Sequence, residues 1–249
     1  MVHKIKNKEM TQSKMIKLLT FFCMIISFSH AQTVDEIQQK YITALGGKSK
    51  LSTLKNIYQE ADMEVMGMVM PAKLWVVYKT AMRQEIDIQG QKIATFVGKN
   101  SGWTINPMMG STEAQPLPED AIKGYLGMLD PGGELSSFKD YGYAATFEGK
   151  EAVNASDAYK IKLAKDSSET ILYIDVKTNL LTKSITKGNA GGQSVEITTL
   201  FSDYKTSPEG YVFPYSLTIN NPMIGEIKST ITKLDINKPV DIAELEKKN

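Results

Sequence analysis

Apolar residues recur at helical spacing in one short segment, between positions 34 and 45. Their recurrence every three or four residues predicts a helix with one apolar face. Thr33 and Glu36 stand at the spacing of a capping box, in which each side chain accepts a hydrogen bond from a free backbone N–H at the start of the helix. Gly46-Gly47 supplies a C-terminal stop. We therefore expect an N-terminal helix.

From Asn56 the hydrophobic period changes to two, which is typical of a strand with one face on a core and one in water. The next run, Met68 to Lys79, is apolar on nearly both faces, so each face of that strand needs an apolar cover. Further strands are predicted at 83–89, 91–97, 102–106, 142–149, 157–164, 169–176, 180–188, 193–204, 211–220 and 225–236.

Residues 107–140 interrupt the series of strands. They hold a helix-like stretch from Pro118 to Leu129, which ends ahead of a Pro131-Gly132-Gly133 break. The pattern predicts a single, mainly β (α+β) domain over 32–249, with about eleven strands in one curved antiparallel sheet. The N-terminal helix and the inserted helical segment are expected to cover its concave face. Residues 241–249 look like a polar tail.

The first 31 residues have the pattern of a secretory signal peptide. Five lysines precede an apolar run from Leu18 to Phe28, and Ser29-His30-Ala31 offers small residues for cleavage. The run is well short of the roughly 20 residues that a membrane-spanning helix needs, which disfavours a permanent anchor. The mature chain is then expected to begin at Gln32. Cys23 lies inside the run and no cysteine follows it, so N-terminal lipidation is not expected and a soluble exported form is.

Composition excludes several kinds of chemistry after that cleavage. Both histidines and the only cysteine lie within 1–31, so the mature chain has neither side chain. Ser-His-Asp and Cys-His catalysis, histidine or thiolate metal sites and disulfides are excluded for it. Removing the signal takes away five lysines and one glutamate, which leaves 24 basic and 27 acidic residues and a net charge of −3. Nothing in this balance favours nucleic acid as a partner, and no motif predicts a cofactor.

Methionines are the first candidate ligand contacts. Four of them crowd one predicted hairpin between positions 63 and 70, and Met108 and Met109 fall in the inserted loop where a lid would sit. Flexible, polarizable thioethers suit exchanging apolar ligands, but they also serve as ordinary core filling. Both interpretations stay open.

Other residues have equally open interpretations. Trp75 and Trp103 fit a sheet core or a cavity wall, and Arg83 is the only arginine among 29 basic residues. A planar guanidinium could hold loop carbonyls or a carboxylate, or be a surface residue without a role. The carboxylates at 60, 62 and 64 alternate onto a strand face that is predicted to be wet, which disfavours a metal site. Ser-x-x-Lys occurs four times, mostly as expected by chance, and no companion motif supports a hydrolase.

Five short motifs, in order, resemble the LolA/LolB-like outer-membrane lipoprotein-sorting protein family. They are Leu74–Lys79, Met82-Arg83, Gly98–Pro107, Asp203-Tyr204 and Gly210–Pro214. The resemblance implies an incomplete antiparallel β-barrel of about eleven strands, a helical lid, and a hydrophobic cavity that shelters acyl chains in the periplasm, without catalysis.

Carried over by position, Arg83 matches the family's strand arginine, Trp75 the strand aromatic and Trp103 the tryptophan after the glycine turn. Lys79 falls near the family's basic residue but is followed by threonine where proline is frequent, which leaves open whether Arg83 latches a lid. Lipidated receptors of the family carry cysteine where Gln32 stands, which favours a soluble carrier. The candidate cavity or lid residues are Met63, Met68, Met70, Leu74, Trp75, Arg83, Trp103, Met108 and Met109.

The leading hypothesis is a non-enzymatic, monomeric periplasmic carrier of acylated lipoproteins or other lipids, working between donor and acceptor proteins of the inner and outer membranes. The alternative is a non-catalytic sensor or interaction domain of the same half-barrel fold that docks a protein partner. A hydrolase that uses carboxylates or a Ser/Lys pair is the third hypothesis.

Overall fold

The computed structural model describes residues 33–166, 168–190 and 193–248. The predicted signal peptide, 1–31, lies outside the described residues. Residues Thr33–Asn249 form one compact unit, and that unit is described here by itself.

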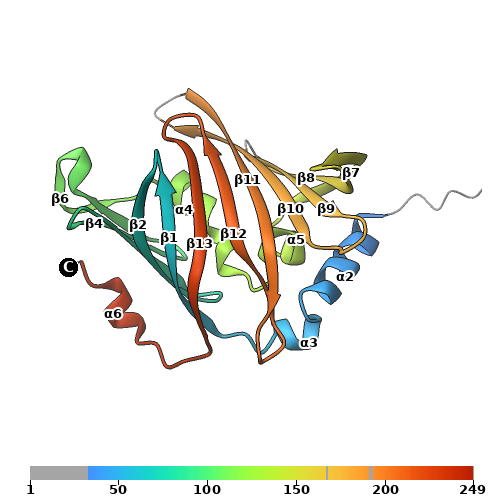
Figure 1. The fold of residues 1–249 in the computed structure, drawn as a ribbon, viewed down its shortest axis with the longest axis horizontal. Coiled ribbons are helices and arrows are strands. Elements are labelled where there is room, and N and C mark those ends of the chain that lie inside the picture. The colour runs from blue at the N-terminus through green and yellow to red at the C-terminus, as the bar shows by residue number, and fades with distance from the viewer. Residues whose placement is uncertain (1–32, 167, 191–192, 249) are drawn as a thin grey trace, which may run out of the picture. The chain divides into compact units, whose positions relative to one another are not determined.

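The described residues form thirteen strands in one antiparallel sheet, in the order β6-β5-β4-β3-β2-β1-β13-β12-β11-β10-β9-β8-β7 (Figure 1). The strands are β1 (Asn56–Val65), β2 (Met68–Val77), β3 (Ala81–Ile88), β4 (Gln91–Gly98), β5 (Gly102–Asn106), β6 (Ser111–Pro116), β7 (Ala144–Val153), β8 (Ser156–Lys165), β9 (Ser168–Asp175), β10 (Leu181–Ala190), β11 (Gln193–Thr206), β12 (Val212–Asn221) and β13 (Gly225–Ile236). Because β6 and β7 are the edges and do not pair with each other, the barrel is incomplete, as predicted.

Helices are few and short. The α-helices are α2 (Val34–Ala44), α3 (Lys48–Leu51), α4 (Glu119–Tyr125), α5 (Gly133–Ser137) and α6 (Ile242–Glu246), and the 3-10 helices are η1 (Pro107–Met109) and η2 (Leu126–Leu129). The predicted capping box opens α2: the Glu36 amide donates to Thr33 Oγ1 over 3.2 Å, and the Thr33 amide donates to Glu36 Oε2 over 3.3 Å.

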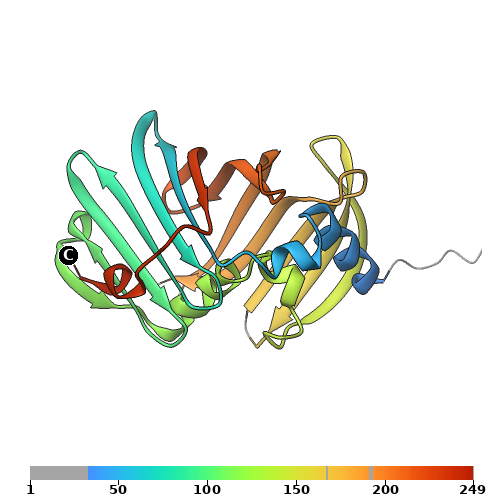
Figure 2. The same cartoon turned by 90° about the horizontal axis from the view of Figure 1, so that it is seen from below.

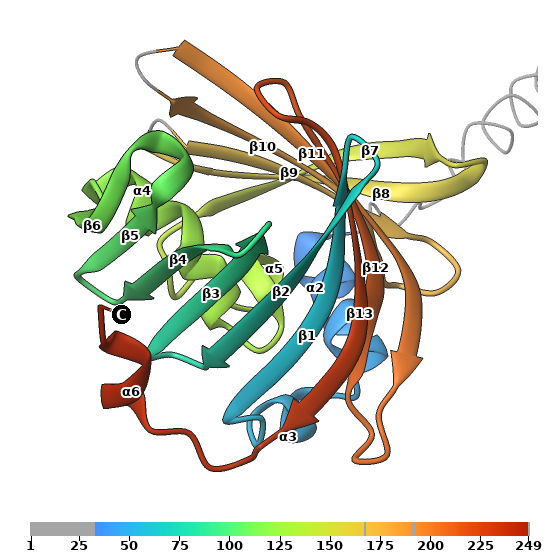
Figure 3. The same cartoon turned by 60° about the vertical axis from the view of Figure 1, so that its left-hand side comes forward.

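The sheet topology explains where the inserted helices lie. Since β6 and β7 are opposite edges of the sheet, the chain between them must cross the whole sheet, and it does so with α4, η2 and α5. Figure 3 shows the sheet curving around these helices and α2. The view from below shows α6 outside the curve, near the β2–β6 end of the sheet (Figure 2).

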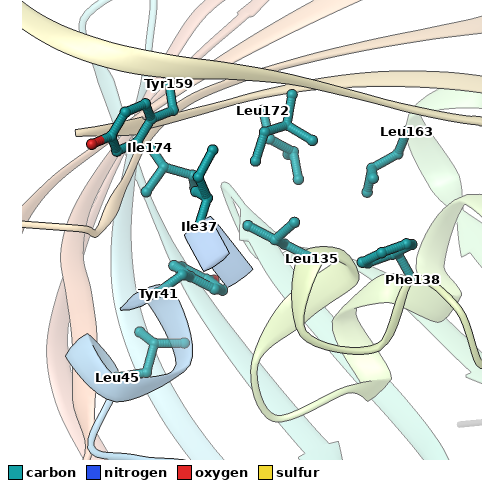
Figure 4. Close-up of a cluster of buried hydrophobic side chains, with 10 residues drawn as sticks. Ile37, Tyr41, Leu45, Leu135, Phe138, Tyr159, Leu163, Leu172 and Ile174 are labelled. Carbon is teal, nitrogen blue, oxygen red and sulfur yellow. The ribbon is translucent and has the colours of Figure 1, made fainter. Parts of the chain in front are cut away.

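Two hydrophobic clusters fill the concave side. In one, α2 and α5 pack on β8 and β9 through Ile37, Tyr41, Leu135, Ile161 and neighbouring side chains (Figure 4). In the other, α4 and η2 pack on β1 to β4 and β13. The members of this second cluster are Leu54, Ile57, Leu74, Val76, Met82, Val97, Ile122, Leu129, Tyr211 and Ile236.

Strand β2 has apolar cover on both faces, as its sequence predicts. Leu74 belongs to the concave cluster. Trp75 and Val77 pack on the opposite face with Leu245 of α6. The described part of the predicted polar tail, residues 241–248, is therefore not free, because it contains the helix α6, whose Leu245 is only 6% exposed.

About eleven strands were expected and thirteen are present; each of the twelve predicted ranges overlaps a strand, so β6 is the one strand without a predicted range. β6 was missed because the prolines around it are unfavourable in a central strand, whereas an edge strand tolerates them. The short helix α5 was missed as well, because its Gly-rich start looks like a plain break.

Candidate ligand-binding site

A cavity of about 320 Å³ lies between the inserted segment and strands β9 to β12. Most of its wall is apolar. The lining residues are Tyr41, Leu45, Tyr78, Gly124, Gly127, Met128, Asp130, Pro131, Gly132, Gly133, Glu134, Leu135, Thr170, Leu172, Ile174, Leu181, Ser184, Thr186, Phe201, Tyr204, Val212, Phe213 and Pro214.

The cover of this cavity, residues 126–137, is tied to the rest of the domain by hydrogen bonds to its backbone. Tyr41 Oη donates to the Gly132 carbonyl over 2.9 Å, and Gln38 Nε2 donates to the Leu135 carbonyl over 2.8 Å. At the other end, the Lys79 amide donates to the Leu129 carbonyl over 2.7 Å. The first two bonds come from α2, so the N-terminal helix positions the cover as well as filling the core.

The loop between η2 and α5 is also held internally. Asp130 Oδ1 accepts hydrogen bonds from the Gly132 amide over 3.0 Å and from the Ser136 hydroxyl. Gly133 has a φ of 68°, a left-handed conformation that glycine adopts without steric cost. The Gly-Gly pair that predicts a break is therefore needed for a tight turn into α5.

Glu134 is the one carboxylate that reaches the cavity from α5. Burial raises the pKa of this carboxyl, and a hydrogen bond with Thr170 on β9 partly offsets the rise. No ion pair joins it to a lysine or to Arg83 within the described part of the chain. Gly127 lies beneath the side chain, and a Cβ there would come within 2.4 Å of Glu134 Cγ.

Three tyrosines of the wall stay neutral. Burial raises the pKa of Tyr41, Tyr78 and Tyr204, with smaller contributions from Asp130 at the first two. The Tyr204 hydroxyl donates to the Leu181 carbonyl over 2.6 Å, so its donor is already used. These rings contribute apolar surface to the cavity, not charge.

A second, more polar pocket of about 640 Å³ lies against the cover. It shares Tyr78, Asp130, Pro131 and Gly132 with the cavity wall. Four lysines and two aspartates line this pocket, which gives it an excess of positive charge: Lys48, Lys55, Lys79, Lys139, Asp130 and Asp140. The inner cavity is therefore apolar with acidic groups, whereas its neighbour is basic.

A row of four apolar side chains and one serine continues from the cavity wall across the concave face. Phe201 pairs with Leu217, Leu217 with Ser229, Ser229 with Met63, and Met63 with Met70, each in antiparallel register on adjacent strands. Paired residues share a sheet face, so this row lies on the same face as the cavity. Sequence analysis placed two of its five members, Met63 and Met70, among the candidates.

The remaining predicted methionines lie elsewhere. Met68 is 48% exposed near the β1–β2 turn. Met108 and Met109 belong to η1, between β5 and β6, and are 60% and 82% exposed. They lie outside the inserted helices, the first of which, α4, begins only at Glu119. None of the nine predicted site residues lines the 320 Å³ cavity, and Leu74 is part of the packed concave core. Their role as ligand contacts stays a prediction.

Trp75, Arg83 and Trp103 meet on the convex face. Arg83 Nη1 donates to the carbonyls of Leu245 over 2.9 Å and Lys247 over 2.6 Å, and its guanidinium lies 5.2 Å from the ring centre of Trp103. Trp75 and Arg83 also line one pocket with Leu245. Because Met82 faces the inserted helices, the adjacent Arg83 faces away from them, and it holds the C-terminal segment instead of a lid.

Sequence analysis did not find Glu134, Thr170 or Phe201 as site residues. Thr170 and Phe201 lie in predicted strands, but alternation does not show which strand face is concave. Glu134 follows a Gly-Gly break and carries no motif at all. The one sequence feature that could have indicated Glu134 is the Gly132-Gly133 pair before it, because this pair marks where the inserted segment turns.

Two kinds of feature were sought among the described residues, a metal-binding cluster and a membrane-spanning helix. Within 33–166, 168–190 and 193–248, no group of three or more histidine, cysteine, aspartate or glutamate side chains is arranged to hold a metal ion. The same ranges contain no helix with the length and apolarity required to cross a bilayer.

Comparisons with known proteins identify the fold. No protein-family model matches the sequence, and no curated protein matches it. Among solved structures, the chain is similar to a putative outer membrane lipoprotein-sorting protein domain from Vibrio parahaemolyticus, at a TM-score of 0.57 and 13% identity, covering 86% of this chain and 97% of that one. A DUF1329 family protein from Desulfovibrio piger gives the same values.

A LolA superfamily protein from Nitrosomonas europaea is similar at a TM-score of 0.54 and 10% identity, covering 82% of this chain and 96% of that one. Three separate matches thus span nearly the whole of each known domain. The chain therefore has a LolA-like fold.

Proposed function

We propose that this chain is an exported, non-enzymatic periplasmic carrier that shelters an acyl chain of a lipoprotein or another lipid during transfer towards the outer membrane. The observation that carries the proposal is the apolar cavity beneath the tied cover. The LolA-like fold supports it, as does the proposed signal peptide.

The size of the cavity bounds the cargo. If each methylene needs about the 30 Å³ that one water molecule occupies in the liquid, 320 Å³ holds roughly ten methylenes, or one acyl chain of medium length. At about 0.8 kcal/mol for each buried methylene, such a chain would gain roughly 8 kcal/mol. A second or longer chain would need the row from Phe201 to Met70, reached if the cover moves outward.

The first experiment purifies the chain from periplasm, identifies co-extracted lipid by mass spectrometry, and titrates an apolar fluorescent probe. Phe201→Glu places a charge in the cavity wall and is expected to weaken probe binding more than tenfold. Ser202→Glu adds the same charge to the next, exposed residue of β11 and is expected to leave binding unchanged. Absence of lipid and of probe binding, or equal binding by both variants, would refute the carrier.

A protein-docking domain is the second candidate, and one observation favours it. The β1–β2 and β12–β13 turns are neighbours, because Val65 pairs with Ile227, and they expose Met66 at 83% and Met223 at 71%. Exposed apolar side chains gathered on one rim are typical of an interaction surface. Three results together would favour this function. Cross-linking in the periplasm captures one stoichiometric protein, the Met66→Glu/Met223→Glu variant loses that partner, and the unmodified chain does not bind the apolar probe.

A further inference from the structure

The charges around the cavity are all of one sign. Asp130 and Glu134 line it, and no lysine, arginine or histidine does so among the described residues. The other titratable groups of the wall are Tyr41, Tyr78 and Tyr204, and burial raises the pKa of each. A carboxylate or phosphate placed inside would lose its water and find no cation.

The two acidic groups are not equivalent. Asp130 is occupied by the Gly132 amide and the Ser136 hydroxyl, within its own loop. Glu134 of α5 lines the cavity together with Thr170 of β9, the one side chain that partly offsets the rise in its pKa, and it joins no ion pair in the described ranges. Its carboxyl oxygens therefore have capacity left for a donor supplied by a ligand.

Hydroxyl groups continue from Glu134 across the neighbouring strands. Thr170 pairs in register with Thr186 on β10, and both line the cavity together with Ser184, two residues along the same strand. Leu172, Leu181 and Phe201 form apolar wall on the same strands. The cavity thus has an apolar part that suits a hydrocarbon chain, and beside it a row of neutral hydroxyl groups that begins at the Glu134 carboxyl.

We infer that the cavity selects cargo whose buried portion carries a neutral hydrogen-bond donor, such as the hydroxyl of a hydroxylated acyl chain or long-chain alcohol, and that it rejects chains ending in a carboxylate. This inference rests on the proposed function and specifies its ligand class. A hydroxyl donates to Glu134 and accepts from the threonines, which satisfies both sides. A buried carboxylate beside Glu134 would be an unpaired charge next to a like group.

The neighbouring 640 Å³ pocket differs from the cavity in the sign of its charge. That pocket has four lysines against two aspartates, and it shares the 130–132 wall with the cavity. An anionic headgroup therefore has a basic environment just outside the cover. The selection by Glu134 applies only to the part of the cargo that enters the apolar cavity.

The test measures displacement of the apolar probe from the full chain, purified from periplasm, by 1-decanol, decyl methyl ether and decanoate at pH 8. These ligands share a chain length that fits 320 Å³ and differ only in their polar end. A purely apolar cavity would bind the ether more tightly than the alcohol, because the hydroxyl loses hydrogen bonds to water. We expect the reverse, with 1-decanol at least threefold tighter than the ether.

The variant Glu134→Gln keeps the shape of the side chain, removes the charge and adds a donor. We expect the ratio of decanoate to 1-decanol dissociation constants to fall at least tenfold relative to the unmodified chain. Glu209→Gln, at an exposed turn position, makes the same change in net charge and should leave the ratio unaltered. The preference for alcohol over ether is measured on the unmodified chain, so it tests the inference even if Glu134→Gln folds poorly.

The outcomes separate the two proposals. If the probe does not bind the unmodified chain, the carrier function and the selectivity both fall. If the probe binds and is displaced, but the ether equals or exceeds the alcohol, the carrier stands and the selectivity is overturned. An unchanged decanoate ratio in a folded Glu134→Gln protein overturns it in the same way.

Discussion

Replacing Arg83 by leucine is expected to release the C-terminal helix and to destabilise the whole domain. The Arg83 side chain is 4% exposed, donates to two carbonyls of 245–247, and contacts Glu85 Oε1 at 2.8 Å through Nε. Leucine removes every donor and leaves one buried acceptor, the Leu245 carbonyl, and two partly buried ones, the Lys247 carbonyl and the Glu85 carboxylate, without Arg83. The substitution would also remove the guanidinium that lies over the Trp103 ring on the convex face of the sheet.

The magnitude follows from what is left unpaired. Removing one partner of a buried ion pair costs about 3–5 kcal/mol, because the other charge stays buried. Glu85 retains Lys92 at 3.2 Å, which keeps the cost within this range even though two carbonyl hydrogen bonds are also lost. For a domain of this size, each kcal/mol shifts Tm by about 2–4 °C, so Tm should fall by about 6–20 °C.

Urea unfolding followed by tryptophan fluorescence is the assay, because Trp103 Nε1 donates to the Glu246 carbonyl over 3.2 Å and reports on α6 directly. Lys187→Leu is the matched control. Its ion pair with Glu169 is as short, at 2.7 Å, but exposed, and exposed pairs contribute less than about 1 kcal/mol. If Arg83→Leu unfolds within 1 kcal/mol of the unmodified chain, the anchoring role is wrong; loss of probe binding at full stability would restore a ligand-related role.

Three further predictions concern the cover and the core. Burial raises the folded-state pKa of Glu134, so the stability that its protonated form contributes is complete below its unfolded pKa, about 4.3, and is lost as pH rises through the folded pKa. The free energy of unfolding, measured by denaturation from pH 4 to 8, should therefore decline less steeply with pH for Glu134→Gln than for the unmodified chain. Parallel curves would contradict this. Gly127→Ala places a methyl 2.4 Å from Glu134 Cγ and should cost about 1–3 kcal/mol in thermal unfolding, and a neutral result would mean that the cover relaxes freely. Ile37→Ala, at a fully buried position of α2, should lower the free energy of unfolding by about 2–5 kcal/mol. It should also loosen the cover, which would be measured as faster amide exchange at Leu135. Loss of stability with unchanged exchange would show that α2 does not position the cover.

Local patterns predicted much of the fold because they depend on neighbours in sequence. The Thr33 and Glu36 cap needs only four residues, and it is present. Alternation places side chains on two faces of a strand whatever the rest of the chain does. The apolar surface on both sides of β2 likewise announced that something must cover each face, as α6 and the inserted helices do.

Alternation shows which residues share a face, but not which face becomes concave. That choice follows from the pairing of β1 with β13 and from the connection between the two edges, β6 and β7. Both join segments that are distant in sequence, so no local signal encodes them. The same holds for Arg83, because the two C-terminal carbonyls that it binds lie more than 160 positions away along the chain.

The cavity itself was decided by tertiary structure. Glu134, Thr170 and Phe201 meet only because α5 crosses to strands that come later in the chain. Sequence by itself determined the alternation of apolar and polar residues, and it placed every histidine and cysteine within the first 31 residues. Long-range packing decided where the apolar cavity lies and that Glu134 faces it, because burial is a property of the assembled sheet and not of any one strand.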